Sequence, residues 1–110
     1  MHAVVVWWEL AGTGRTIAEL RDFLRDEAVD RFAAVPGLVL KTWISDEARE
    51  RWGAIFLWES AEAAAQPIPT RAAEIIGAPP GHRHAFDVEA TVQGVHTLDS
   101  LSGHGLAFAS

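Results

Sequence analysis

The chain has 110 residues, 49% of them hydrophobic and 22% charged, a composition typical of one globular domain with a modest core. Its formal net charge of -6 disfavours nucleic acid and anionic membranes as partners, because both bind clustered Lys and Arg side chains. The absence of cysteine excludes disulfides, a thiolate nucleophile and cysteine-ligated metal, and it is typical of the cytoplasmic location that we expect. No basic segment precedes the first apolar run, so we expect no secretory signal peptide.

The first third of the chain predicts a strand followed by a helix. Residues 2–10 are β-branched and aromatic, and because their apolar run is continuous we expect a strand buried on both faces. A helix should begin after Thr16, which stands three residues before Glu19, the spacing of a capping box. Apolar residues then recur at helical spacing until the sequence VPG at 35–37 ends the helix: Ile17, Leu20, Phe23, Leu24, Ala28 and Phe32.

The middle of the chain predicts a hairpin and an interrupted helix. Residues 38–44 and 52–59 are apolar runs joined by a polar loop, the connection that two antiparallel neighbours need. Ser60 is placed to cap a second helix, which two prolines should break before it resumes over residues 70–76.

A fourth strand within residues 82–97 completes the order β-α-β-β-α-β, which predicts an α+β, ferredoxin-like fold with a four-stranded antiparallel sheet. We expect residues 1–97 to form this single domain. Residues 98–110 would be a C-terminal tail, either loosely ordered or docked on the partner subunit. Because both sheet faces are apolar and helices cover one, we expect a homodimer in which two sheets form a dimeric α+β barrel.

Alternation along the hairpin places one cation and four aromatic side chains on one sheet face: Lys41, Trp43, Trp52, Phe56 and Trp58. A symmetric register would pair Trp43 with Trp52 and Lys41 with Ala54. The four aromatic residues would then bind a small hydrophobic or aromatic substrate. Lys41 would lose solvation, which lowers its pKa, and cation–π contacts could hold it. We expect Lys41 to act in catalysis by stabilising a developing oxyanion.

Two structural alternatives stand beside this hypothesis. Aromatic residues facing each other across strands often serve only to stabilise a sheet. Lys41 could instead extend to solvent from an edge strand, where lysine also prevents aggregation.

His84 is the candidate general base, because it could face the aromatic pocket and histidine titrates near neutral pH. His82 and His84 also form an H-x-H pattern on one face of the fourth strand. Zinc sites need at least three protein ligands, so we expect no metal there, although the sequence leaves the point open.

The stretch PGLVLKTWISDEARERWGAIFLWES resembles the hairpin of the YdhR-like mono-oxygenases, which are small dimeric α+β barrel proteins. Their pattern is a G-x-x-x-K-x-W strand followed by a G-x-I-aromatic-L-aromatic strand. Eight residues fall on it: Gly37, Lys41, Trp43, Gly53, Ile55, Phe56, Leu57 and Trp58. The sequence FDV at 86–88 also resembles the last strand of that family.

The sequence FLWES at 56–60 resembles a turn of the antibiotic-biosynthesis mono-oxygenases, which oxidise anthrone- or quinol-like polyketides with molecular oxygen and no bound cofactor. The resemblance implies a pocket around Trp58 beneath the helices, a mono-oxygenase of secondary metabolism and no cofactor. The chain departs from that pattern in having no tyrosine, and in having Ala54 where an asparagine can contribute. Two alternatives remain: a cofactor-free cyclase or isomerase on the same fold, and a non-catalytic small-molecule-binding or stress-response dimer.

Overall fold

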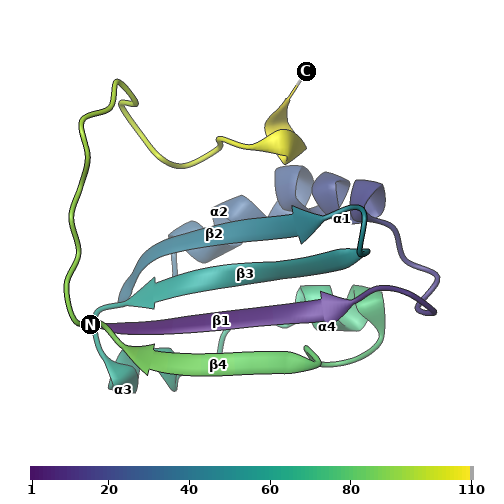
Figure 1. The fold of residues 1–110 in the computed structure, drawn as a ribbon, viewed down its shortest axis with the longest axis horizontal. Coiled ribbons are helices and arrows are strands. Elements are labelled where there is room, and N and C mark those ends of the chain that lie inside the picture. Colours follow the sequence, from purple (N-terminus) through teal and green to yellow (C-terminus); the bar gives the residue numbers. More distant parts are fainter. Residues whose placement is uncertain (110) are drawn as a thin grey trace.

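The computed structural model describes residues 1–109, which form a four-stranded antiparallel sheet with all helices of the fold on one face (Figure 1). The strands are β1 (His2–Glu9), β2 (Leu38–Asp46), β3 (Arg51–Trp58) and β4 (His82–Asp87). Their order across the sheet is β2-β3-β1-β4, so the first strand is central and the hairpin lies beside it. This arrangement confirms the predicted ferredoxin-like α+β fold.

The first helical segment packs its apolar side onto the sheet. It comprises α1 (Ile17–Phe23), a five-residue π-helical stretch η1 (Leu24–Ala28) and α2 (Val29–Ala33). The Thr16 hydroxyl accepts a hydrogen bond from the Glu19 N–H at 3.2 Å, as the capping spacing predicts. All six residues of the predicted apolar face are buried, whereas the π-helical stretch was not predicted.

The second helical region is interrupted as expected. Helix α3 (Ala61–Ala64) begins at Ser60, whose hydroxyl accepts a hydrogen bond from the Ala63 N–H at 3.0 Å. Helix α4 (Arg71–Ile76) follows two prolines, which cannot continue a helix. It ends at Gly77, whose φ of 94° lies in the left-handed region that glycine adopts without strain.

Gly53 lets β1 and β3 approach each other closely at the centre of the sheet. A Cβ atom at this position would lie against the Val6 carbonyl oxygen and 2.7 Å from the Trp7 Cβ. Real Cβ atoms do not come so near to backbone, so a side chain here would force the two strands apart.

The register of the hairpin differs from the predicted one by two residues. Trp43 pairs with Ala54 and Lys41 pairs with Phe56, because the strands continue to Asp46 and Arg51 and leave a tighter turn. The Asp46 carboxylate supports that turn by accepting a hydrogen bond from the Arg49 N–H at 3.2 Å. A shift of two residues preserves the side of the sheet that each residue faces.

Strand β4 is shorter than expected. It ends at Asp87, and residues 88–97 contain no regular secondary structure. The chain then runs past the β2 edge of the sheet and ends near α1 (Figure 1). There a short 3-10 helix, η2 (Leu106–Phe108), packs against α1 of the same chain, and Ala107 is buried in the core. Docking of this tail on a partner subunit stays a prediction.

Candidate active site

Lys41 lies on β2 with its side chain on the helix-covered face of the sheet. Its Nζ atom is 3.2 Å from the centroid of the Phe32 ring, 4.3 Å from that of Trp43 and 4.5 Å from that of Phe56. The amine therefore points into a cage of three aromatic rings and not out to solvent. The alternative in which Lys41 extends into water from the edge strand does not fit this geometry.

Burial among these rings lowers the pKa of Lys41 from 10.5 to about 6. The physical cause is desolvation, since an ammonium loses its hydrogen bonds to water when apolar groups surround it. Among residues 1–109, no Asp or Glu forms an ion pair with Lys41 that would offset this loss. At neutral pH the side chain is thus mostly a neutral amine, which is a base and not a fixed cation.

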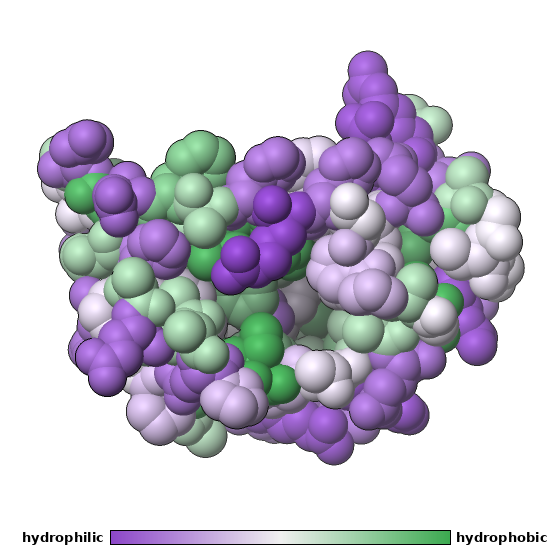
Figure 2. All heavy atoms as spheres, turned by 90° about the horizontal axis from the view of Figure 1, so that it is seen from below, coloured by the Kyte–Doolittle hydropathy of each residue, from purple (hydrophilic) through white to green (hydrophobic). Residues whose placement is uncertain are grey.

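A cavity of about 250 Å³ opens beside Lys41 between the sheet and the helices. Its aromatic wall includes the four predicted substrate-binding residues: Trp43, Trp52, Phe56 and Trp58. Space exists because small residues face it from three elements, Ala54 on β3, Ala64 on α3 and Ala73 on α4. Figure 2, which views the molecule from the β4 side, shows a hollow containing hydrophobic residues and bordered by hydrophilic ones.

The aromatic side chains hold one another in place. The rings of Phe56 and Trp58 stack with centroids 5.8 Å apart, and Phe32 meets Trp43 edge to face at 5.6 Å. Four of the predicted site residues, together with Lys41, therefore share one wall.

Phe32 is a site residue that sequence analysis missed. The helical pattern marked Phe32 as buried, but no sequence signal showed that its ring lies over Lys41.

The structure places His84 on the opposite face of the sheet, so the expectation that it faces the pocket is wrong. His84 pairs with Val5 of β1, and both point away from the helices. Its ring stacks on Trp7 with centroids 5.5 Å apart, and His82 stacks on the same indole at 4.4 Å. His84 therefore lies across the sheet from Lys41 and does not line the cavity.

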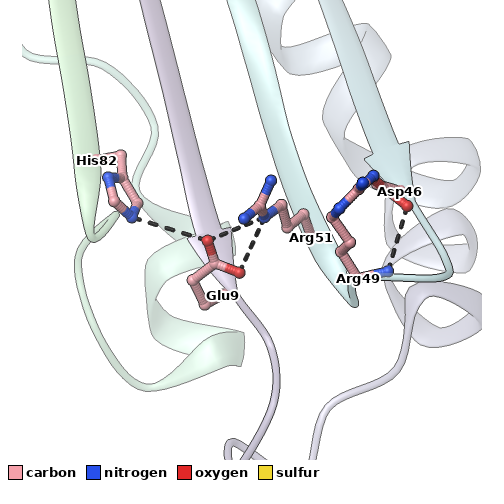
Figure 3. A network of polar contacts seen from close by, with 5 residues as sticks. All are labelled: Glu9, Asp46, Arg49, Arg51 and His82. Carbon is pink, nitrogen blue, oxygen red and sulfur yellow. Dashed lines mark hydrogen bonds and ion pairs between the residues drawn. The ribbon is translucent and has the colours of Figure 1, made fainter.

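The face that carries the two histidines is apolar in its middle and charged at one end. Four large hydrophobic residues are at least 39% exposed there: Leu40, Ile44, Ile55 and Phe86. At the end of the sheet, Glu9 accepts two hydrogen bonds from Arg51 at 3.0 and 3.1 Å and lies 3.8 Å from His82 (Figure 3). Half-exposed pairs of this kind contribute little to stability, about 0–1 kcal/mol each.

The C-terminal tail forms one wall of a second, open cleft of about 740 Å³ along β2. Lys41, Trp43 and Phe32 line this cleft as well as the cavity, so both lead to the same amine. His104 lines the cleft from the tail and is a titratable group that sequence analysis did not single out. No sequence signal could have placed His104 in the cleft, because nothing local in the sequence shows that the tail returns to β2.

Residues 1–109 offer neither a cluster of metal ligands nor a membrane-spanning helix. No group of three or more His, Asp or Glu residues could hold a metal ion, and neither His82 nor His84 forms part of one. No helix in this part of the chain is long and apolar enough to cross a membrane.

Comparison with known proteins connects this geometry to a family. The crystal structure of an N63A mutant of SnoaB, a cofactor-independent oxygenase from Streptomyces nogalater, has a similar fold. Its TM-score is 0.58 at 18% identity, and the match covers 84% of this chain and 97% of that one. No curated protein sequence matches the chain. Residues 9–95 match the family described as "Putative mono-oxygenase ydhR", and the chain therefore belongs to the YdhR family.

Proposed function

We propose that the protein is a cofactor-independent mono-oxygenase of a small hydroxyaromatic or quinol-like substrate. The observation that carries this proposal is the neutral amine of Lys41 inside an aromatic cavity. A base with a pKa near the working pH is suited to remove a weakly acidic proton from a bound aromatic ring system. The YdhR family and the fold shared with a cofactor-independent oxygenase support oxygen as the co-substrate.

The reaction requires no cofactor. The Lys41 Nζ removes a proton from an activated CH2 group of the substrate, which an anthrone carries and a hydroquinone presents in its keto tautomer, and the resulting carbanion is delocalised as an enolate. The carbanion donates an electron to O2, and recombination of the radical pair forms a C–O bond and a peroxide anion. Lys41 returns its proton to the peroxide anion, which gives a hydroperoxide. Loss of the remaining C–H proton then forms the C=O bond as the O–O bond breaks, and the departing hydroxide takes up that proton as water. The sum is CH2 + O2 → C=O + H2O, and Lys41 is again neutral.

The aromatic cage has a second role in this scheme. Once Lys41 accepts the proton, its ammonium stands against the faces of Phe32, Trp43 and Phe56. Aromatic faces attract cations, with an interaction of about 2 kcal/mol when water is excluded. The cage therefore offsets part of the desolvation cost of that ammonium, and the resting amine is still neutral because the loss of hydration is the larger effect.

We also propose that the chain forms a homodimer through the open face of the sheet. The exposed apolar residues on that face support a homodimer, because an exposed apolar patch usually marks an interaction site. Trp7 is half-buried on the same face, and its indole N–H has no hydrogen-bond partner among residues 1–109. A second copy packed sheet against sheet would cover these groups and leave the cavity under the helices open.

Oxygen uptake tests the proposed reaction. Wild-type protein and Lys41→Met are each mixed with anthrones and naphthohydroquinones. O2 consumption is followed with an electrode from pH 5 to 8. We expect uptake that rises through pH 6, as Lys41 loses its proton, and a fall of at least about 100-fold in Lys41→Met. Lys41→Met must keep the wild-type circular dichroism spectrum for the comparison to count.

Three outcomes would count against the proposal. Equal rates in wild type and Lys41→Met would show that Lys41 is not the base. Loss of substrate without loss of oxygen would indicate a cyclase or isomerase that uses the same amine. Binding without any turnover would indicate a non-catalytic binding protein.

A further inference from the structure

The cavity beside Lys41 is lined by several basic side chains and, among residues 1–109, by no carboxylate. Its four basic residues come from four different elements of the fold: Arg31, Lys41, Arg71 and Arg83. This is unusual in a chain whose net charge is -6 and which has 15 acidic residues against 9 basic ones. Basic side chains therefore gather at this cavity in a chain that is acidic as a whole.

Three of the four basic residues already have a partner or a role. Lys41 is the desolvated amine of the proposed reaction. Arg31 and Arg71 form ion pairs on their own helical segments, Arg31 with Glu27 at 3.5 Å and Arg71 with Glu74 at 3.4 Å. Arg83 differs, since it makes no hydrogen bond or ion pair with any side chain among residues 1–109. Its guanidinium is therefore available to a ligand.

The sheet places Arg83 on the cavity side. Arg83 pairs with Val6, Val6 pairs with Ala54, and Ala54 pairs with Trp43, so these residues form one row across the helix-covered face. Lys41 stands two residues before Trp43 on the same face. Strands lie about 4.8 Å apart, so the backbones at the two ends of this row are roughly 14 Å from each other.

Two long basic side chains therefore reach into the cavity from opposite edges of the sheet, the neutral amine of Lys41 and the charged guanidinium of Arg83. Between them lie Val6 and Ala54, which are small and apolar and leave a flat floor. An elongated aromatic molecule on this floor would have Lys41 at one end and Arg83 at the other. The volume of about 250 Å³ favours a mono- or bicyclic ring system over a larger polycycle.

We propose that the cavity binds an aromatic acid, with its carboxylate held by Arg83 and its reactive end beside Lys41. This inference rests on the proposed function in so far as both use the same cavity, and it adds the substrate class. The planar guanidinium suits a carboxylate because it donates two parallel hydrogen bonds. Arg83 is a binding residue in this arrangement and has no part in the proton transfer.

Isothermal titration calorimetry tests the proposal without any turnover. The probes are 2-naphthoate and 2-naphthamide, which have the same ring system and nearly the same shape, but only the first is anionic. We expect wild-type protein to bind the acid at least about tenfold more tightly than the amide at low ionic strength. In Arg83→Gln the two affinities should become equal through loss of acid binding, while amide binding stays unchanged. Arg83→Lys should retain part of the preference.

Arg49→Gln is the matched control, since it removes one positive charge from an exposed turn outside the cavity. It should leave both affinities at the wild-type values. The proposal is overturned if the amide binds as well as the acid, if Arg83→Gln keeps the preference, or if neither probe binds.

The two proposals fail separately. A preference for the acid that depends on Arg83, with no oxygen uptake from hydroxynaphthoates, would refute the oxygenase and leave the aromatic-acid site standing. Oxygen uptake from neutral quinols with no preference for an acid would have the opposite meaning.

Discussion

The Nζ atom of Lys41 lies 3.2 Å from the centroid of the Phe32 ring, although one residue belongs to an edge strand and the other to a helix. The contact brings a titratable amine against the hydrophobic underside of the helical layer. Water has little access to this point, so the amine gives up its proton at a lower pH than an exposed lysine does. The packing of helix against sheet at this contact therefore produces the neutral amine that the proposed chemistry needs.

The first prediction concerns how stability depends on pH. Folded Lys41 has a pKa of about 6, below that of an unfolded lysine, so the unfolded chain binds more protons between these two values. The free energy of unfolding should therefore rise with pH across that range, by up to about 1.4 kcal/mol per pH unit. Urea unfolding from pH 8.5 to 9.5 isolates the effect, because the chain has no Tyr or Cys and Lys41 is its single lysine.

Lys41→Met should abolish that slope and stabilise the protein at neutral pH, since Met needs no hydration in an apolar cage. Arg31→Met serves as control, because it removes a half-exposed cation and should leave the slope as it is. A wild-type stability that is flat over this pH range would show that Lys41 keeps an ordinary pKa.

The second prediction concerns the close approach of β1 and β3. Gly53→Ala should lower the free energy of unfolding by about 2–4 kcal/mol, because the new methyl group would meet Val6 and Trp7 backbone. Gly94→Ala is the control, since a Cβ there meets nothing within 4 Å. Chemical denaturation measures both, and equal stabilities of the two variants would contradict the observed packing.

The third prediction concerns the open face of the sheet. Ile55→Glu should convert the proposed homodimer into a monomer, because it would bury a charge without a partner in the middle of the interface. Ala61→Glu adds the same charge to an exposed position at the start of α3 and should leave the dimer intact. Native mass spectrometry gives the result directly, and a wild-type protein that is monomeric would remove the basis of the prediction.

The fourth prediction concerns the tail. A chain ending at Thr97 should still fold, because the sheet and helices are complete without the tail, but it should lose about 1–2 kcal/mol of stability with the packing of Ala107. Ala107→Glu should cause a loss of similar size, whereas Ala109→Glu, at an exposed position, should not. Failure of the shortened chain to fold would place the domain boundary beyond residue 97.

Local sequence signals were sufficient for most of the fold. Thr16, Ser60 and Gly77 each fix the end of a helix through contacts within a few residues, so their roles could be predicted from short patterns. Alternation along the hairpin also placed Lys41 and Trp43 on one face correctly, because that property depends on backbone geometry alone.

The rest depended on contacts between distant segments. Alternation along the strand predicted that His82 and His84 share a face. Only the pairing of β4 with β1 decides whether that face is the one covered by the helices. The site residue Phe32 was equally hidden, since its ring reaches Lys41 across the gap between helix and sheet. Positions of this kind follow from packing over the whole chain and not from any local pattern.

The π-helical stretch between α1 and α2 has a consequence for insertions and deletions. A π turn holds one residue more than an α turn, so it accommodates that residue without rotating the helix that follows. Loss of one residue from Leu24–Ala28 would therefore restore an ordinary helix and leave Phe32 over Lys41. If the same residues formed a regular α-helix with no deletion, everything after them would rotate by about 100° and Phe32 would leave Lys41.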